Sequence, residues 1–220
     1  MCVQGGPALV TVKAHESRVF CLDVAPARGL LLSAGKDGTL KAWRLVALED
    51  KNPGPLWVFD KNGGLTSAIN CLSVLDTDGV AYLGTLNDGF YAINLSDGLQ
   101  RWTQFLHTTE VTVDPAKGRV FAARCAEFGG KGTVRCHASS GSVLWSRSVQ
   151  LGDTSGAMSH QRAMGIAFCS VQQVLFTATN KDGRIMSFDA RDVRGVGSGR
   201  HAHRAMLASA VPSTDHRSCV

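Results

Sequence analysis

Apolar and polar residues alternate along much of this chain in short runs that are separated by glycine-containing turns. In the clearest example, the apolar run Leu30–Gly35 is followed by a turn around Asp37 and Gly38 and then by the alternating run Thr39–Leu45. Aspartate hydrogen-bonds to its own backbone and glycine accepts a positive φ, so this pair favours a tight turn. Alternation with a period of two indicates strands. The stretch therefore predicts a β-hairpin.

The hairpin recurs along the chain. The turn glycines Gly38, Gly89, Gly132 and Gly183 are 51, 43 and 51 residues apart, and another apolar run precedes each hairpin. Three strands are thus expected in each of four units. The predicted strands are Val19–Ala25, Leu30–Gly35 and Thr39–Leu45; Ala68–Leu75, Val80–Thr85 and Phe90–Leu95; Val111–Asp114, Val120–Cys125 and Thr133–Ala138; and Met164–Ser170, Val174–Thr179 and Arg184–Asp189.

A fourth strand is indicated by three tryptophans that are 45 and 43 residues apart. Each opens a short run, and a glycine stands four residues before two of them, Gly98 and Gly141. Four strands that repeat at a period of about 40–50 residues are typical of β-propeller blades. The predicted outer strands are Trp57–Phe59, Trp102–Phe105 and Trp145–Val149.

Four residues of the first unit carry a resemblance to a known family. His15, Ser33, Asp37 and Trp43 occupy the positions of the structural tetrad of WD-repeat proteins, with Ala14 and His15 in place of the usual Gly-His pair. The resemblance implies a hydrogen-bonded chain from the Trp indole through Ser and His to Asp, which requires that every member is satisfied. The later units lack the tetrad, so apolar packing is expected to hold them. Their Gly-x-x-x-Trp pattern resembles the quinoprotein-type propeller repeat.

The sequence therefore predicts an all-β fold, a β-propeller of about four four-stranded blades that is incomplete or open. The WD-repeat resemblance implies that the N-terminal run Leu9–Lys13 completes the last blade, which would remove an open edge; a closed four-bladed ring is the alternative. We expect WD-like blades over residues 1–190. The Gly/Arg/His-containing tail, 191–220, is expected to be flexible and disordered.

The composition of the chain indicates its cellular compartment and the kinds of partner that it is not expected to have. The formal net charge of +5 is too modest to indicate a nucleic-acid surface. Seven cysteines, an odd number, fit reduced thiols better than a disulfide framework. No apolar run is long enough to cross a bilayer, and the N-terminus lacks the pattern of a signal peptide. We expect a cytoplasmic protein without membrane contact, with the nucleus as the alternative.

Catalytic and metal sites are not expected. Two groups of cysteine and histidine residues, named at the end of this paragraph, are candidates for zinc ligands, but neither has paired Cys-x-x-Cys spacing. Side chains alternate between the two faces of a strand, so Cys136 and His137 are expected on opposite faces. The Gly195-x-Gly197-x-Gly199 run lacks the Lys-Ser/Thr of a phosphate loop. Asp76-x-Asp78-Gly79 lacks the acid that closes a calcium loop. No nucleophile-elbow glycines flank Ser33 as in a hydrolase. The two imagined zinc sets are Cys125, Cys136 and His137, and His201, His203 and Cys219.

The strongest functional signal is a set of polar turn residues that a propeller would place on one face, although lysine is also the ordinary choice at an exposed turn. This candidate partner-binding face comprises Arg18, Lys36, Asn87, Lys131 and Lys181. The hypothesis is that it binds acidic or phosphorylated segments through point charges.

The predicted role is that of a WD-repeat type scaffold for protein–protein interactions. We expect no enzymatic activity and no cofactor. A second chain is a candidate for completing the propeller. The alternatives are a quinoprotein-like enzyme and an RNA-associated scaffold, the latter disfavoured because the Arg/His tail lacks interleaved aromatic residues.

Overall fold

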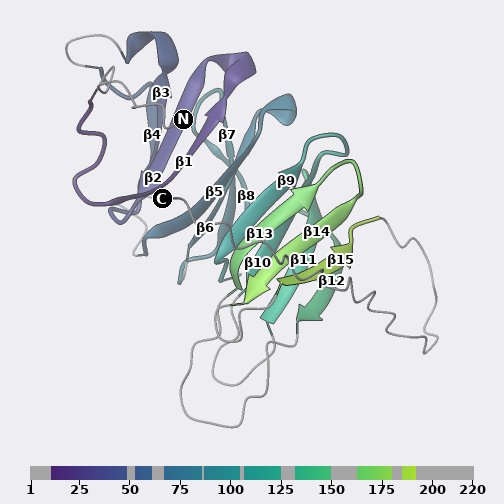
Figure 1. The fold of residues 1–220 in the computed structure, drawn as a ribbon. Helices are drawn as coiled ribbons and strands as arrows, with labels where there is room; N and C mark the ends of the chain where they lie inside the picture. Colours follow the sequence, from purple (N-terminus) through teal and green to yellow (C-terminus); the bar gives the residue numbers. More distant parts are fainter. Residues whose placement is uncertain are drawn as a thin grey trace, which may run out of the picture.

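The chain forms a row of four antiparallel sheets, here called blades 1 to 4 in sequence order (Figure 1). The computed structural model describes residues 11–48, 53–60, 67–85, 87–104, 107–124, 132–149, 163–179 and 185–191. Blade 1 comprises β1 (Val19–Ala25), β2 (Leu30–Gly35), β3 (Leu40–Arg44) and β4 (Trp57–Phe59); blade 2 comprises β5 (Ile69–Leu75), β6 (Val80–Thr85), β7 (Phe90–Asn94) and β8 (Gln100–Gln104). Blade 3 comprises β9 (Glu110–Asp114), β10 (Arg119–Arg124), β11 (Gly132–Ala138) and β12 (Val143–Val149); blade 4 comprises β13 (Ala163–Cys169), β14 (Val174–Thr179) and β15 (Ile185–Asp189). Three single-turn 3₁₀ helices complete the elements: η1 (Pro26–Arg28), η2 (Leu45–Ala47) and η3 (Asp76–Asp78).

The fold class predicted from the sequence, an open propeller, is confirmed, with one difference in the last blade. Within the described residues blade 4 has three strands rather than four. Thr11–Lys13 form no strand here, and Leu9 and Val10 lie outside the described residues. The tail 191–220, of which only Arg191 is described, cannot be compared with its prediction.

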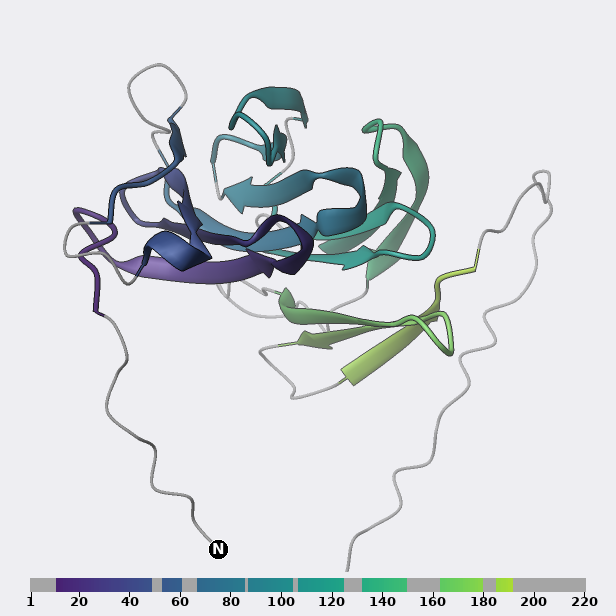
Figure 2. The same cartoon turned by 90° about the horizontal axis from the view of Figure 1, so that it is seen from above.

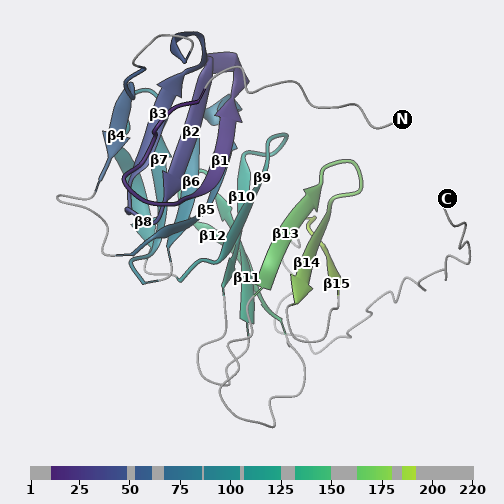
Figure 3. The same ribbon diagram turned by 60° about the vertical axis from the view of Figure 1, so that its left-hand side comes forward.

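Apolar side chains fill the three junctions between neighbouring blades. Leu32 of blade 1 shares a cluster with Leu83 of blade 2, and Tyr82 on the other face of blade 2 shares one with Val120 of blade 3. Phe121 shares the third with Leu175 of blade 4. The inner strands β1, β5, β9 and β13 touch in that order, and within the described residues no comparable contact joins β13 to β1. Figures 2 and 3 accordingly show blade 1 (purple) and blade 4 (green) as the two ends of the row.

The Gly-x-x-x-Trp pattern is explained by contacts between blades. The Trp57 indole crosses from β4 to blade 2, where its Nε1 donates to the Leu95 carbonyl (3.1 Å). Its ring lies against Gly98, at which a Cβ would stand 2.6 Å from the indole. Trp102 repeats the arrangement on Gly141 of blade 3. Both glycines also have positive φ, +73° and +90°. Each position therefore requires glycine for two reasons, the close indole ring and the backbone conformation.

His137 of β11 lies fully buried between blades 2 and 3. Its ring centroid is 5.4 Å from that of Phe90 and 6.2 Å from that of Trp102, on which it stacks. Within the described residues its Nε2 has no hydrogen-bond partner. Burial lowers the pKa of His137, partly opposed by its contact with the Gly141 carbonyl, because a charged imidazole loses its hydration there.

This burial predicts an acid-sensitive fold. The unfolded chain binds a proton at His137 near pH 6.5 but the folded chain does not, so the free energy of unfolding should fall as the pH drops from about 6.5 toward the lowered pKa of the folded state. Urea unfolding at a series of pH values measures this. His137→Phe keeps an aromatic ring beside Trp102 and should flatten the profile. The other six histidines are common to both proteins, so an unchanged slope would contradict the assignment.

Candidate functional site

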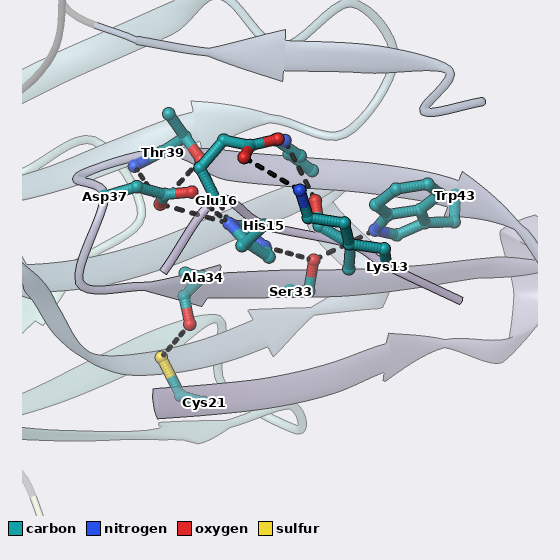
Figure 4. Close-up of polar contacts among 11 residues, drawn as sticks. Lys13, His15, Glu16, Cys21, Ser33, Ala34, Asp37, Thr39 and Trp43 are labelled. Atoms are coloured by element: carbon teal, nitrogen blue, oxygen red, sulfur yellow. Dashed lines mark hydrogen bonds and ion pairs between the residues drawn. The ribbon is translucent and has the colours of Figure 1, made fainter. Parts of the chain in front are cut away.

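Four side chains of blade 1 form one hydrogen-bonded chain (Figure 4). Trp43 Nε1 of β3 donates to Ser33 Oγ of β2 over 2.9 Å. Ser33 Oγ lies 2.7 Å from His15 Nε2, in the segment that leads into β1. His15 Nδ1 lies 2.9 Å from Asp37 Oδ2, in the turn between β2 and β3. The structure thus brings together all four residues that the sequence placed in the tetrad.

The Asp37 carboxylate sets the direction of each bond. A carboxylate can only accept, so His15 carries a hydrogen on Nδ1 and donates it to Asp37. In the neutral tautomer Nε2 is then an acceptor, and the Ser33 hydroxyl, which accepts from Trp43, donates to it. Every polar atom of the chain is satisfied in this arrangement, which is the condition for a buried network to stabilise a fold.

Asp37 is held from a second side by Thr39, which the sequence analysis missed. The Thr39 amide and hydroxyl both donate to Asp37 Oδ1, over 3.1 and 2.9 Å. Partial burial raises the pKa of Asp37, but the hydrogen bonds from Thr39 and His15 outweigh it and the pKa lies below its usual value. The available signal was the Asp-x-Thr spacing, because an aspartate commonly accepts from the amide two residues on.

The same residue types occur in hydrolytic triads, but the burial of this set opposes that chemistry. Ser33 is 1% exposed and His15 is 6% exposed. A substrate carbonyl would have to approach Ser33 Oγ, which is enclosed between Trp43 and His15. The geometry is that of a structural clamp for the turn that holds Asp37.

The clamped turn carries the exposed part of the candidate partner-binding face. Lys36 precedes Asp37 and is exposed, and its amide donates to the Arg18 carbonyl over 2.8 Å, which sets two exposed cationic residues side by side. Asn87 is exposed at the corresponding turn of blade 2. Lys131 and Lys181 lie outside the described residues. The structure therefore places three of the five residues at exposed positions, and it pairs two of them.

Comparison with known proteins identifies the family. The family model described as outer membrane protein assembly factor BamB (PQQ_2) matches residues 11–206, most of the chain. The chain belongs to this BamB-like propeller family. No curated protein matches it.

Solved structures that resemble this BamB-like chain show the same fold. The WD40 repeats of RRP9 align with a TM-score of 0.64 at 16% identity, covering 81% of this chain and 50% of that one. A chain of the Mitotic Checkpoint Complex aligns at 0.63 and 16% identity, covering 82% and 54%. The computationally designed Ika4 protein aligns at 0.58 and 18% identity, covering 84% and 99%. The fold is that of WD40 propellers, and this chain spans about half the length of the RRP9 structure.

The family match raises the question of a quinone or metal site in this BamB-like chain. Among the described residues no three His, Cys, Asp or Glu side chains converge. The buried Arg119 is engaged with Asp114. Cys136 packs toward Phe121 of the junction with blade 4, whereas His137 packs toward blade 2. The described residues thus provide no donor set for such a group, and Cys125, His201, His203, Cys219 and the 195–199 glycine run lie outside them.

The thiols of Cys21, which is half-buried, and Cys71, which is buried, are poorly suited to nucleophilic chemistry. Burial raises the pKa of Cys21 to about 12 and that of Cys71 well above its ordinary value, so neither carries appreciable thiolate near neutral pH. Asp76, the first acid of the calcium-like run, instead accepts from the Ala27 amide of blade 1 over 2.8 Å and pairs with Arg28. In the described part of the chain, no helix has the length and apolar character needed to span a membrane.

Proposed function

We propose that this chain is a non-catalytic platform that binds other proteins through the partner-binding face. The observation that carries the proposal is the clamped turn of blade 1, on which Lys36 lies exposed beside the exposed Arg18, above the buried hydrogen-bonded chain from Trp43 to Asp37. A rigid turn binds with a smaller entropy cost than a flexible one. The family description names an assembly factor, and one chain of similar fold belongs to a checkpoint complex, which supports a binding role. We propose the cytoplasm as the place of that role, with the nucleus as the alternative.

The proposed ligand is an acidic or phosphorylated segment. Lysine and arginine side chains recognise carboxylates and phosphates by charge-assisted hydrogen bonds. Exposed cations act over about 10 Å at moderate salt, so several on one face reinforce one another. Asn87 would add a neutral hydrogen-bonding group on the neighbouring blade.

Charge reversal tests the proposal. The double variant Lys36→Glu, Lys181→Glu should weaken binding of a fluorescent peptide of glutamate and phosphoserine at least about tenfold at low salt, about 1.4 kcal/mol, measured by anisotropy. Lys117→Glu is the matched control, because Lys117 is exposed in the β9–β10 turn at the opposite end of the strands. Equal binding by all three proteins, or equal loss in the control, would retire the proposed ligand.

One second candidate is favoured by the family match, an enzyme of the quinoprotein type. Quinone-dependent reduction of a dye by the full chain would support it over the platform.

A further inference from the structure

Within the described residues, each end blade leaves a surface open that is covered or paired in the inner blades. The face of blade 1 that points away from blade 2 exposes several large apolar side chains: Phe20 at 46%, Leu22 at 61%, Val24 at 47% and Val58 at 45%. At the other end, β15 has a strand partner on one side only within the described residues. Ile185 on β15 is 75% exposed. Neither feature fits a finished propeller, because exposed apolar faces and free strand edges favour association.

The inner junctions show what normally covers such a face. Leu22 pairs with β2 in the same register in which Leu72 pairs with β6, and Val24 matches Val74 in the same way. Val74 is only 8% exposed because blade 1 packs over it, whereas Val24 is 47% exposed. The open face of blade 1 is therefore built like a face that another blade covers.

The N-terminal run indicates which blade that is. Five residues separate the outer strand β8 from the inner strand β9 of the next blade, and five residues separate Lys13 from β1. Leu9–Lys13 thus stands in the chain where the outer strand of a blade preceding blade 1 would stand, and its Leu, Val and Val residues suit a strand. In the part of the chain that the structure describes, blade 4 is the blade that lacks an outer strand.

Lys13, at the end of the N-terminal run, is held too far from blade 4 of its own chain for the run to pair with β15 there. His15 is fixed to blade 1 by Ser33 and Asp37, and Lys41 Nζ donates to the Ala14 carbonyl over 2.9 Å. Lys13 is two residues from His15, so it lies within about 7 Å of it. Blade 4 lies at the other end of the row (Figures 1 and 3). A second copy of this chain offers such a blade, since its blade 4 leaves the edge of β15 open within the described residues.

We propose that two copies of this chain close into one eight-bladed ring, twice the four blades of each copy. The open face of blade 1 packs on blade 4 of the second copy, and Leu9–Lys13 adds to β15 of that copy as its fourth strand. Each copy then makes the same head-to-tail contact with the other, and the four blades of each copy together complete the ring. The part of this chain that aligns with the RRP9 structure covers 50% of that structure, so this chain alone accounts for about half of a propeller of that length. The inference is independent of the proposed partner-binding face.

The proposal specifies a strand register. Phe90 begins β7 and pairs with Gln104, the last residue of β8. Ile185 likewise begins β15, so it would pair with Lys13, and Ser187 would pair with Thr11. Val12 would then lie beside Met186, which packs toward blade 3, so the apolar residues of both strands share one face.

The mass in solution gives the first test. Light scattering of the full chain should give twice the chain mass of 23.4 kDa. Leu22→Glu should reduce this to one chain mass, because a charge on the open face must be buried in the ring. Leu99→Glu is the matched control, since Leu99 is 64% exposed on blade 2, away from both ends, and should stay dimeric. A single-chain mass for the unaltered protein, or an assembly larger than two copies, would overturn the proposal.

A cross-link gives the second test and does not depend on the behaviour of Leu22→Glu. Cysteines at paired positions of neighbouring strands lie within disulfide distance. The double variant Thr11→Cys, Ser187→Cys should form a covalent dimer under oxidation, and each single variant should do so no more than the unaltered protein, which controls for the native cysteines. A cross-linked monomer would show that the chain closes its own ring, and no cross-link would show that the strand does not add to β15; either result contradicts the proposal.

Discussion

Replacing Arg119 with methionine is expected to lower the free energy of unfolding by about 3–5 kcal/mol. Arg119 is 2% exposed, and its Nε and Nη2 donate to Asp114 Oδ2 over 3.1 and 2.6 Å. Its Nη1 donates to the Ala190 carbonyl over 2.7 Å, and Nη2 also donates to Gln173 Oε1 over 3.0 Å. The substitution leaves the Asp114 carboxylate buried without its cation and releases the end of blade 4 from blade 3. Equilibrium urea unfolding measures the loss.

The chain offers a matched control in a second Arg–Asp pair. Arg191 pairs with Asp189 over 2.7 Å, but their side chains are 71% and 49% exposed. The hydrogen bond from Arg191 lowers the pKa of Asp189 to about 2, yet solvent screens an exposed pair, so Arg191→Met should leave the free energy of unfolding almost unchanged.

A third variant separates the orphaned charge from the lost contacts. Asp114→Asn together with Arg119→Met removes the buried charge as well, and should recover part of the stability lost in Arg119→Met alone. Equal costs for Arg119→Met and Arg191→Met would show that the burial of the first pair contributes nothing. A double variant that is as unstable as the sum of both single variants would show that the carboxylate is not the source of the loss.

The regular part of this fold could be predicted from the sequence because each strand has one apolar face. Val19–Ala25 and Val174–Thr179 have the predicted ends, and Ala68–Leu75 differs from β5 by one residue. The outer strand at Trp102 begins earlier than predicted, at Gln100, since its first residues are polar and exposed and a bulge opposite Ile93 hides the alternation. Hydrophobic period does not reveal strands that lie on the solvent side of a blade.

The sequence could predict contacts of the candidate site only between residues of the same blade. His15 and Trp43 were placed by resemblance, and Thr39 was missed although its bonds to Asp37 are local. Contacts between blades were not accessible in this way. Gly98 stands before Trp102 in sequence but packs against Trp57 of the preceding blade. Arg119 reaches Ala190, 71 residues away, and no local pattern marks that contact.

Ser33→Ala is expected to lower the free energy of unfolding by about 2–4 kcal/mol, because Ser33 is the centre of the tetrad. The alanine leaves two buried groups without partners, the Trp43 indole N–H and His15 Nε2, and each such group costs about 1–3 kcal/mol. The loss should appear in urea unfolding. Ser73→Ala is the control, since Ser73 is half-buried on β5, where its backbone pairs with β6 but its hydroxyl makes no hydrogen bond to a described residue.

The effect should also be local, which separates a clamp from a general loss of packing. In Ser33→Ala, His15 loses one of its two anchors and no longer fixes Asp37, so amide exchange should accelerate from Lys36 to Thr39 before it does in blade 3. Combining Ser33→Ala with Trp43→Phe should cost less than the sum of the two changes, because both remove the same bond. Additive costs, or exchange that rises equally in all blades, would mean that the tetrad does not act as a unit and that the turn carrying Lys36 is held by its backbone alone.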